Sequence, residues 1–323
     1  MQLLGAFFNR AFDRFAFKTS KPKAGVLVCD LRFPEGKSKN SMLCFFAHFD
    51  TNARIHGYVV YLIESLKAAG CDIVFVTASG EQMESSELRK LDGLVVGTIT
   101  RNNFGYDFGS WKAGIDCCLP YLEHYQYLAF TNDSVYGPFA DLSDTIQSMV
   151  KSGCDVWAMT DSYERAHHIQ SYFWGLDFQT VEHGFFERFW QSGFRYCSGR
   201  DEAIEKYELT ILNTAVSKYG LKVGAYVMVE DLIRRFGLED QAGMKTKVSK
   251  VNPVHDYALR LVRDCGVPLV KRELIEKNPR GYEEINELLK YLHESNPKAF
   301  ELMLSHLRQS TKNVNGYKSD LYV

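Results

Sequence analysis

The first hundred residues alternate between short apolar segments and amphipathic ones, and this alternation limits the chain to a small set of folds. Residues 42–46 (MLCFF) and 72–77 (DIVFVT) have the nearly continuous apolar character of strands that are buried on both faces. Between them, residues 58–69 carry apolar side chains at helical spacing and end at Gly70, a residue typical of helix C-termini. Strands that alternate with helices favour a parallel, doubly wound sheet. We therefore expect an α/β fold with helices flanking a mostly parallel sheet.

The rest of the chain extends this pattern. We expect further strands at 24–30, 94–96, 127–130, 155–159, 167–178 and 221–227, helices at 81–91, 201–219 and 255–264, and polar loops at 160–165 and 230–250. No internal repeat or low-complexity linker divides the sequence. We therefore predict an N-terminal segment (1–22), one domain (23–280) and a C-terminal helical tail (281–323).

The strand at residues 127–130 (YLAF) is followed by a polar cluster, TNDS, ahead of Gly137-Pro138. In open α/β sheets, ligands bind beyond the carboxyl ends of the strands. Asn132, Asp133 and Ser134 offer oxygen atoms of the kind that a hard divalent cation prefers. The same residue types are also common in plain turns, so this window alone leaves both interpretations open.

Residues 100–116 (TRNNFGYDFGSWKAGID) form a polar, glycine-rich segment that continues into a predicted helix. Its glycines permit a tight bend and a close approach to a ligand. Arg101 is suited to a bidentate grip on a phosphate, and Asn103 and Asp107 to hydrogen bonds with a ribose or sugar hydroxyl. The segment matches neither the G-x-G-x-x-G fingerprint nor a P-loop. By itself it is equally typical of a loop with two structural glycines.

Composition excludes some classes of function. A net charge of -2 argues against nucleic-acid binding, which usually requires a strongly basic surface. The eight cysteines include no C-x-x-C pair, which is typical of reduced thiols in an intracellular protein. No apolar run approaches the roughly 18 residues of a membrane span. The Phe- and Arg-containing residues 1–18 are typical of an amphipathic helix that docks on the protein or contacts a membrane surface.

Three windows in this order resemble the GT-A fold of nucleotide-sugar glycosyltransferases: a glycine-rich loop, a strand ending in an acidic cluster, and an acidic residue on a late helix before a glycine. The windows AHFD, RNNFGYDFGSWKAGI, LAFTNDSVYGP, HHIQSYFWG, YELTIL, NPVH and VPLVKREL, spread over residues 40–280, are similar to the rhamnan synthesis F family of bacterial glycosyltransferases. The cluster around Asp133 has one carboxylate where the GT-A D-x-D site has two. Metal dependence therefore stays an open prediction.

The resemblance implies roles for individual residues. Glu208 would be the base that deprotonates the acceptor hydroxyl, and Asp133 and His255 would bind a divalent cation, Mn²⁺ or Mg²⁺. His168 and Gln170 would face the acceptor sugar. Donor binding would fall to His48, Asp50, Arg101, Asn103, Asp107, Asn132, Asp133, Ser134, Lys271 and Arg272. As an ordinary helix, residues 201–219 would instead present Glu208 to solvent beside other charges.

The resemblance also implies substrates. The donor would be dTDP-rhamnose, used with inversion, and the acceptor a growing surface polysaccharide or a lipid-linked glycan. Such an enzyme would work in the cytoplasm or at the cytoplasmic face of the inner membrane. Another nucleotide sugar as donor, or a non-catalytic carbohydrate-binding subunit of a polysaccharide assembly complex, remain alternatives. A phosphatase is disfavoured because no second Asp lies two residues after Asp30, and a methyltransferase because no glycine-rich loop follows the first strand.

Overall fold

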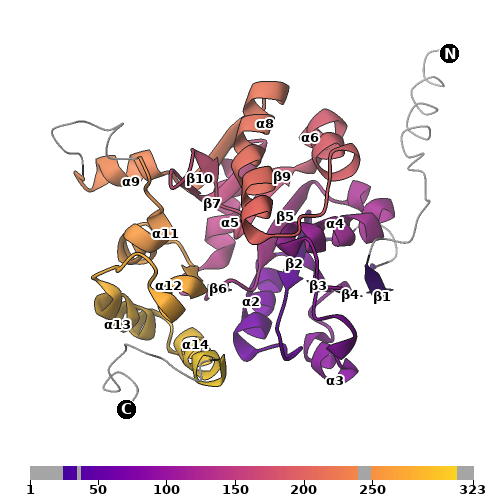
Figure 1. The fold of residues 1–323 in the computed structure, drawn as a ribbon, viewed down its shortest axis with the longest axis horizontal. Helices are drawn as coiled ribbons and strands as arrows, with labels where there is room; N and C mark the ends of the chain where they lie inside the picture. Colours follow the sequence, from indigo (N-terminus) through magenta and orange to yellow (C-terminus); the bar gives the residue numbers. More distant parts are fainter. Residues whose placement is uncertain (1–24, 35–37, 239–248, 311–323) are drawn as a thin grey trace.

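The computed structural model describes residues 25–34, 38–238 and 249–310, which form a mixed α/β fold around a central sheet (Figure 1). The strands are β1 (Val26–Leu31), β2 (Met42–His48), β3 (Cys71–Thr77), β4 (Gly97–Arg101), β5 (Tyr127–Asn132), β6 (Val135–Tyr136), β7 (Val156–Ser162), β8 (His168–Ile169), β9 (Phe173–Asp177), β10 (Val223–Val227) and β11 (Val270–Lys271). The predicted N-terminal segment, 1–22, lies outside the described residues.

Helices connect most of these strands. The α-helices are α2 (Gly57–Ala68), α3 (Ser85–Leu88), α4 (Tyr106–Cys118), α5 (Leu142–Lys151), α6 (Phe178–Val181), α7 (Arg200–Ala203), α8 (Leu209–Tyr219), α9 (Val229–Arg235), α11 (Pro253–Asp256), α12 (Arg272–Lys277), α13 (Ile285–Ser295) and α14 (Pro297–Ser310). Three segments are π-helical: η5 (Glu182–Ser192), η6 (Ile204–Glu208) and η7 (Arg260–Asp264). Short 3-10 turns are η2 (Gly80–Gln82), η3 (Arg89–Leu91) and η4 (Leu119–His124).

The central sheet has the strand order β1-β4-β3-β2-β5-β9-β7-β10, with β8 paired to β7. Strands β2, β3, β4, β5, β7 and β10 run in one direction, whereas β1, β8 and β9 run in the opposite direction. The predicted α/β class with a mostly parallel sheet is therefore confirmed. Because β2, β3, β4 and β5 are neighbours and parallel, their carboxyl ends meet at one edge of the sheet, where such folds place ligands.

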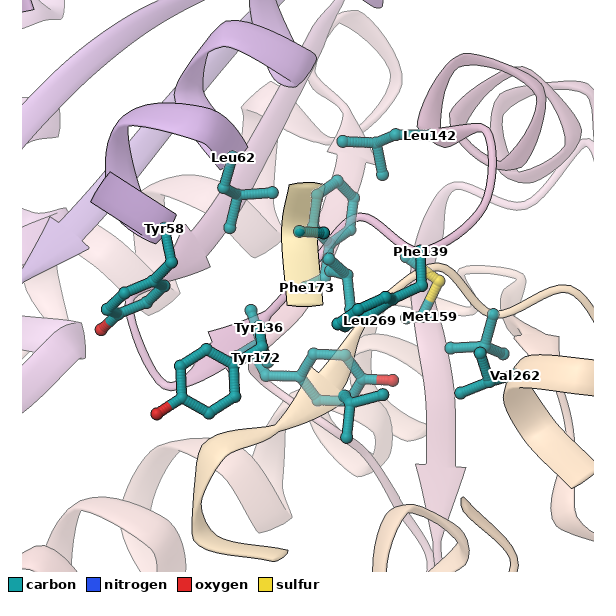
Figure 2. Close-up of a cluster of buried hydrophobic side chains, with 14 of the residues drawn as sticks. Tyr58, Leu62, Tyr136, Phe139, Leu142, Met159, Tyr172, Phe173, Val262 and Leu269 are labelled. Carbon is teal, nitrogen blue, oxygen red and sulfur yellow. The ribbon is translucent and has the colours of Figure 1, made fainter. Parts of the chain in front are cut away.

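Both faces of the sheet are buried, which explains the nearly continuous apolar sequence of β2. Leu43 and Phe45 pack into the core on the α4 and α8 side, and Cys44 and Phe46 into the core on the α2 and α5 side. Each fully buried Phe or Leu contributes about 1.5–3 kcal/mol relative to exposure. Figure 2 shows part of the second core, where Tyr58 and Leu62 of α2 face Tyr136 of β6.

The C-terminal helices belong to the same core. Leu288 and Leu292 of α13 and Met303 of α14 are buried in the core on the α2 side. Helix α14 lies against α2, far from it in sequence (Figure 1). The predicted helical tail is therefore helical over its described part, which packs on the domain.

Several predicted elements have different bounds. The strand predicted at 94–96 begins later, at Gly97, where it pairs with Leu31 of β1. That pairing makes β1 an antiparallel edge strand. The strand predicted at 167–178 is two strands, β8 and β9. It is interrupted at Gln170, whose side chain accepts a hydrogen bond from Thr160, and at Ser171, whose N–H donates to Glu208.

Two predicted loops are partly regular. Strand β7 continues through Ser162 into the expected loop at 160–165, because Gln170 and Ile169 pair with it. The expected loop at 230–250 begins as helix α9, whose Leu232 and Ile233 are buried.

The helix predicted at 81–91 consists of short turns, η2, α3 and η3. Within the described ranges, no helix is long and apolar enough to cross a membrane.

Candidate active site

A cleft of about 400 Å³ opens at the carboxyl ends of β2, β3, β4 and β5. One wall consists of residues at or just after these strand ends, and the other comes from η6, α7, β11 and α12. The lining residues are His48, Phe49, Ala78, Asn103, Tyr106, Asp107, Phe108, Ser110, Asn132, Asp133, Ser134, Ser171, Arg200, Ala203, Ile204, Glu208, Lys271, Arg272, Glu273, Glu276 and Lys277. Most of the donor residues predicted from the sequence therefore lie in one cavity, together with Glu208.

The position of Asp107 follows from how α4 begins. Gly105 has a left-handed conformation (φ 77°) that starts the helix, and Gly109 lets the helix pass close to the preceding loop. One turn further, Trp111 Nε1 donates a 3.0 Å hydrogen bond to the Thr131 carbonyl of β5. The helix is thereby held beside the end of β5, and Asp107 faces the polar cluster there.

A chain of hydrogen bonds crosses the floor of the cleft. Asp107 Oδ2 accepts from Asn132 Nδ2 at 2.8 Å, and Asn132 Oδ1 accepts from Ser134 Oγ at 2.5 Å. Lys271 Nζ donates to Ser134 Oγ at 3.0 Å, and it also lies 4.8 Å from the centre of the Tyr172 ring. A carboxylate and an ammonium group are thus linked through two neutral side chains and do not contact each other directly.

Asp133 sits at the centre of the cleft. Its Oδ2 accepts from the Phe49 backbone N–H at 3.1 Å and lies 4.0 Å from His48 Nε2. Its backbone carbonyl accepts from Tyr58 OH at 2.9 Å and from Arg272 Nη1 at 3.1 Å. Strand β11 pairs with β6, and Arg272 directly after it is fixed by its N–H bond to the Ser134 carbonyl. This pairing brings a distant segment against the end of β5.

Burial and mutual repulsion change the protonation of the cleft acids. Burial, with the nearby Asp133 charge, raises the pKa of Asp107 to about 7. Burial also raises the pKa of Asp133 to about 6, although the Arg272 cation opposes this. His48, which is almost fully buried, has its pKa lowered to about 4 and is neutral. Burial lowers the pKa of Lys271, against the opposing charges of Glu208 and Asp107.

Glu208 lies on the opposite wall. It ends the π-helical segment η6, and its Oε1 accepts from Ser171 N–H at 2.9 Å and Ser171 Oγ at 3.0 Å. Ser171 lies between β8 and β9 in the sequence, and its two hydrogen bonds fix the orientation of the Glu208 carboxylate at the wall of the cleft. A carboxylate held in this way is placed to accept a proton from a group that enters the cleft.

Other predicted site residues lie outside the cleft lining. Arg101 is fully buried, and its guanidinium donates to Ser110 Oγ at 3.0 Å and to the Phe104 carbonyl, so that it holds the loop before α4. Asp50 accepts from the backbone N–H groups of Asn52 and Arg54 and from His56. Burial alone would raise the Asp50 pKa, but these hydrogen bonds hold it below its usual range.

The residues predicted to face the acceptor are buried in the structure. His168 Nδ1 bonds to the Ala166 carbonyl, and Gln170 bonds to Thr160 and Asn252. His255 is also buried, its Nδ1 has no hydrogen-bond partner among the described residues, and burial and the Lys271 charge lower its pKa. The roles predicted for these residues stay predictions.

The cleft also contains residues that the sequence did not single out. Arg200 of α7 and Glu273 of α12 form a 3.2 Å ion pair across the opposite wall. The aromatic residues Phe49 and Tyr106 also line the cleft, and both are exposed to solvent. The charged residues carry no local motif that would reveal them, because segments far apart in the sequence build this wall.

The acids of the cleft fit one mode of cation binding. The described ranges hold no group of three or more His, Cys, Asp or Glu residues that could form a metal site by itself. Asp107 and Asp133, however, line the same cavity and repel each other, and a cation would relieve this repulsion. Mg²⁺ in phosphate-transferring sites is commonly bound by one or two carboxylates plus the substrate phosphates. The two carboxylates fit this mode of cation binding, in which the substrate supplies the other ligands, and do not fit a site built from protein ligands alone.

Comparison with known proteins places the chain in a family. Residues 73–318 match the model of rhamnan synthesis protein F. Virulence protein VirA of Vibrio anguillarum (strain ATCC 68554 / 775) is 29% identical over 240 residues, which cover 69% of this chain and 75% of VirA. The uncharacterized protein y4gN of Sinorhizobium fredii (strain NBRC 101917 / NGR234) is 25% identical over 199 residues, covering 60% of this chain and 49% of y4gN.

Among solved structures, the galactosyltransferase LgtC in complex with donor and acceptor sugar analogs is 12% identical, with a TM-score of 0.41 over 78% of this chain and 96% of LgtC. The mannosyltransferase Ktr4p of S. cerevisiae is 11% identical, with a TM-score of 0.32 over 58% of this chain and 68% of that chain. The family match covers well over half of the sequence. The chain belongs to the rhamnan synthesis protein F family.

Proposed function

We propose that the chain is a glycosyltransferase that moves a sugar from a nucleoside-diphosphate sugar to a glycan. One observation carries this proposal: a single cleft at the strand ends combines a fixed carboxylate, Glu208, with the paired acids and cations around Asp133. Sugar transfer needs a base for the acceptor hydroxyl and positive charge for the leaving diphosphate. Both kinds of group line this cavity.

In the proposed reaction, an acceptor hydroxyl oxygen attacks the anomeric carbon of the donor, and the bond from that carbon to the phosphate oxygen breaks. Glu208 takes the hydroxyl proton, and attack from the face opposite the diphosphate inverts the configuration. Lys271 and Arg272 bind the diphosphate as it gains negative charge. The buried floor around Asn132 and Ser134 orients the donor and excludes water, which would otherwise hydrolyse it.

A divalent cation, Mn²⁺ or Mg²⁺, would be held by Asp133 and Asp107 together with the diphosphate oxygens. When bound, it would neutralise charge on the leaving group. Lys271 and Arg272 offer positive charge at the same place, so the proposal also allows transfer without a cation. Titration of the protein with the nucleotide in EDTA separates these two arrangements, because only cation-dependent binding is lost when the cation is removed.

The family supports a more specific donor and acceptor. Because the chain belongs to the rhamnan synthesis protein F family, we propose L-rhamnose from dTDP-rhamnose as the transferred sugar. The acceptor would be a growing surface polysaccharide or a lipid-linked glycan, met at the cytoplasmic face of the inner membrane. No side chain in the cleft identifies rhamnose by itself, so a different nucleotide sugar is the competing donor.

A thermal-shift screen against dTDP, UDP, GDP and CMP, each with Mn²⁺, Mg²⁺ or EDTA, tests donor binding. A ligand at 100 times its dissociation constant stabilises the folded state by about 2.7 kcal/mol, which such a screen resolves. A shift with dTDP would support a rhamnosyl donor, and loss of the shift in EDTA would support a cation at Asp133. The absence of a shift with every nucleotide would refute a nucleotide-sugar transferase and favour a carbohydrate-binding subunit.

Two variants separate binding from transfer. Asp133→Ala should lose donor binding and sugar transfer together, because the central carboxylate is removed. Glu208→Gln should bind the donor normally and lose transfer, since the amide oxygen still accepts from Ser171 but cannot take a proton. Full transfer activity in both variants would contradict the assignment.

A further inference from the structure

The C-terminal helix α14 places a buried histidine beside the core on the α2 side. His306 is only 3% exposed, and its ring packs against three other rings. The ring centroids lie 4.5 Å from His56, 4.7 Å from Tyr58 and 5.8 Å from Tyr136. Tyr58 and Tyr136 also contact each other, with ring centroids 5.0 Å apart (Figure 2). The imidazole is therefore held in one place by its neighbours.

Hydrogen bonds connect this histidine with the cleft. His306 Nδ1 lies 2.7 Å from Tyr136 OH, and this hydroxyl donates to Glu276 Oε1 at 3.4 Å. The same carboxylate oxygen accepts from Arg272 Nε at 3.2 Å. Glu276 and Arg272 both line the cleft. A continuous set of hydrogen bonds therefore runs from α14 to a cation of the candidate active site.

These hydrogen bonds have one consistent direction. A tyrosine hydroxyl carries a single proton, and a carboxylate only accepts. Tyr136 can therefore donate to Glu276 and stay bonded to His306 only if the imidazole proton is on Nδ1. Burial, with the Arg272 cation, lowers the pKa of His306 to about 3, so the imidazole is neutral and has one proton to donate. His306 is thus the first donor, and the Glu276 carboxylate is the last acceptor.

The guanidinium of Arg272 is fixed at two of its three nitrogens. Nε donates to Glu276, and Nη1 donates to Tyr58 OH at 2.8 Å and to the Asp133 carbonyl at 3.1 Å. Among the described residues, Nη2 has no hydrogen-bond partner, so it is left for a ligand in the cleft. Because the guanidinium is planar and rigid, a carboxylate that fixes Nε also fixes the direction of Nη2.

We propose that His306 is a positioning residue for the transfer, which sets the direction in which Arg272 presents its guanidinium to the donor diphosphate. The inference rests on the proposed function, because the diphosphate is the ligand assigned to Arg272. His306 does not line the cleft and acts only through Tyr136 and Glu276. Without the imidazole, the Tyr136 hydroxyl loses its shorter hydrogen bond, and its bond to Glu276 loses the polarisation that linked hydrogen bonds supply. The carboxylate then holds Arg272 less firmly.

Calorimetric titration with inorganic pyrophosphate, dTDP and UDP, each with Mg²⁺, tests this role. His306→Ala should weaken binding of pyrophosphate and of the better nucleotide by about tenfold, the lower end of what a hydrogen bond to a charged group contributes. Tyr136→Phe keeps the ring, removes only the hydroxyl, and should weaken binding similarly. Gln309→Ala is the matched control, since Gln309 lies on the same helix but bonds to Ser305 of that helix, and it should bind like the wild type.

Added imidazole separates the hydrogen bond of His306 from its packing. A second cavity, of about 360 Å³, borders His306 and shares no lining residue with the cleft. His306→Ala enlarges this cavity, so imidazole from solution can enter it and donate to Tyr136. The imidazole should restore pyrophosphate binding in His306→Ala and leave the wild type and Tyr136→Phe unchanged. A weakened His306→Ala variant that imidazole does not rescue would overturn the inference.

An Arg272→Lys background shows whether His306 acts through Arg272. Lysine keeps a cation for the ligand but has no Nε to pair with Glu276. In this background His306→Ala should weaken pyrophosphate binding by less than about twofold, because residues that act as one unit are not additive. A tenfold loss there would overturn the inference. A wild-type protein that binds diphosphates, with His306→Ala and Tyr136→Phe equal to it, refutes the positioning role alone. A wild-type protein that binds neither pyrophosphate nor any nucleotide refutes the proposed function too.

Discussion

Replacing Asp107 by Asn should make the ligand-free protein more stable, and the gain should depend on pH. Burial and the Asp133 charge raise the Asp107 pKa from an ordinary value near 3.8 to about 7. The folded state therefore disfavours the carboxylate. Asn at this position keeps the hydrogen bond from Asn132, because its side-chain oxygen accepts in the same place. The variant thus removes a charge and little else.

The sign follows from proton linkage. A carboxyl group whose pKa is raised on folding contributes stability that is fully present below pH 4 and is lost as the pH rises to about 7. A difference of about three pKa units corresponds to roughly 4 kcal/mol. Because Asp107 is only partly buried and water screens its charge, we expect about 2 kcal/mol at pH 8. At pH 5 the gain should be less than half as large, because at this pH the wild-type protein has lost only part of the stability that protonated Asp107 contributes.

Urea denaturation at pH 5 and pH 8, in EDTA and without nucleotide, measures this gain through the intrinsic tryptophan fluorescence. Asp50→Asn serves as a control of opposite sign, since hydrogen bonds hold the Asp50 pKa below its usual range and its charge stabilises the fold at pH 8. A gain for Asp107→Asn of the same size at both pH values would show a steric effect. No gain at pH 8 would refute the electrostatic reasoning.

Two further substitutions test the supports of the cleft. Arg272→Met removes hydrogen bonds to a backbone carbonyl and to a tyrosine hydroxyl, and should lower the free energy of unfolding by about 2 kcal/mol, with the exposed Lys277→Met as an almost neutral control in the same urea titration. Gly109→Ala would place a methyl group 2.7 Å from a backbone carbonyl oxygen and should lower the free energy of unfolding by about 2 kcal/mol. Gly199→Ala, which has open space around it, should change the melting temperature little. Equal shifts in melting temperature for the two variants would contradict the packing argument.

The sequence indicated much of the sheet because its central strands are buried on both faces. Such strands must be apolar throughout, so 42–46 and 72–77 could be recognised without their partners. The position of the edge strand β1 along the chain follows from its apolar residues, but its antiparallel direction depends on its pairing with β4, which lies far from it in the sequence. Local sequence contains no signal for a contact of this kind.

The sequence likewise indicated some residues of the candidate site and missed others. Asp133 was singled out because it directly follows a buried strand, and strand ends of parallel sheets converge. Arg101 was expected to meet a ligand because its neighbours are polar, yet its guanidinium is buried beneath the start of α4, where only the folded helix provides partners. Arg200 was not singled out, because its place in the cleft depends on how α7 packs opposite β11.

Asp107 and Lys271 are kept apart on the floor of the cleft, and this separation connects the stability of the cleft with its proposed chemistry. Among the described residues, neither Asp107 nor Lys271 forms a direct ion pair; Asn132 and Ser134 stand between them. A direct pair would satisfy both charges and leave little attraction for a ligand. Separated by neutral groups, the acids keep a raised pKa and the cation a lowered one, so the ligand-free cleft is less stable than it could be. That free energy becomes available when a ligand brings both a cation and a diphosphate, which is the combination that the proposed donor supplies.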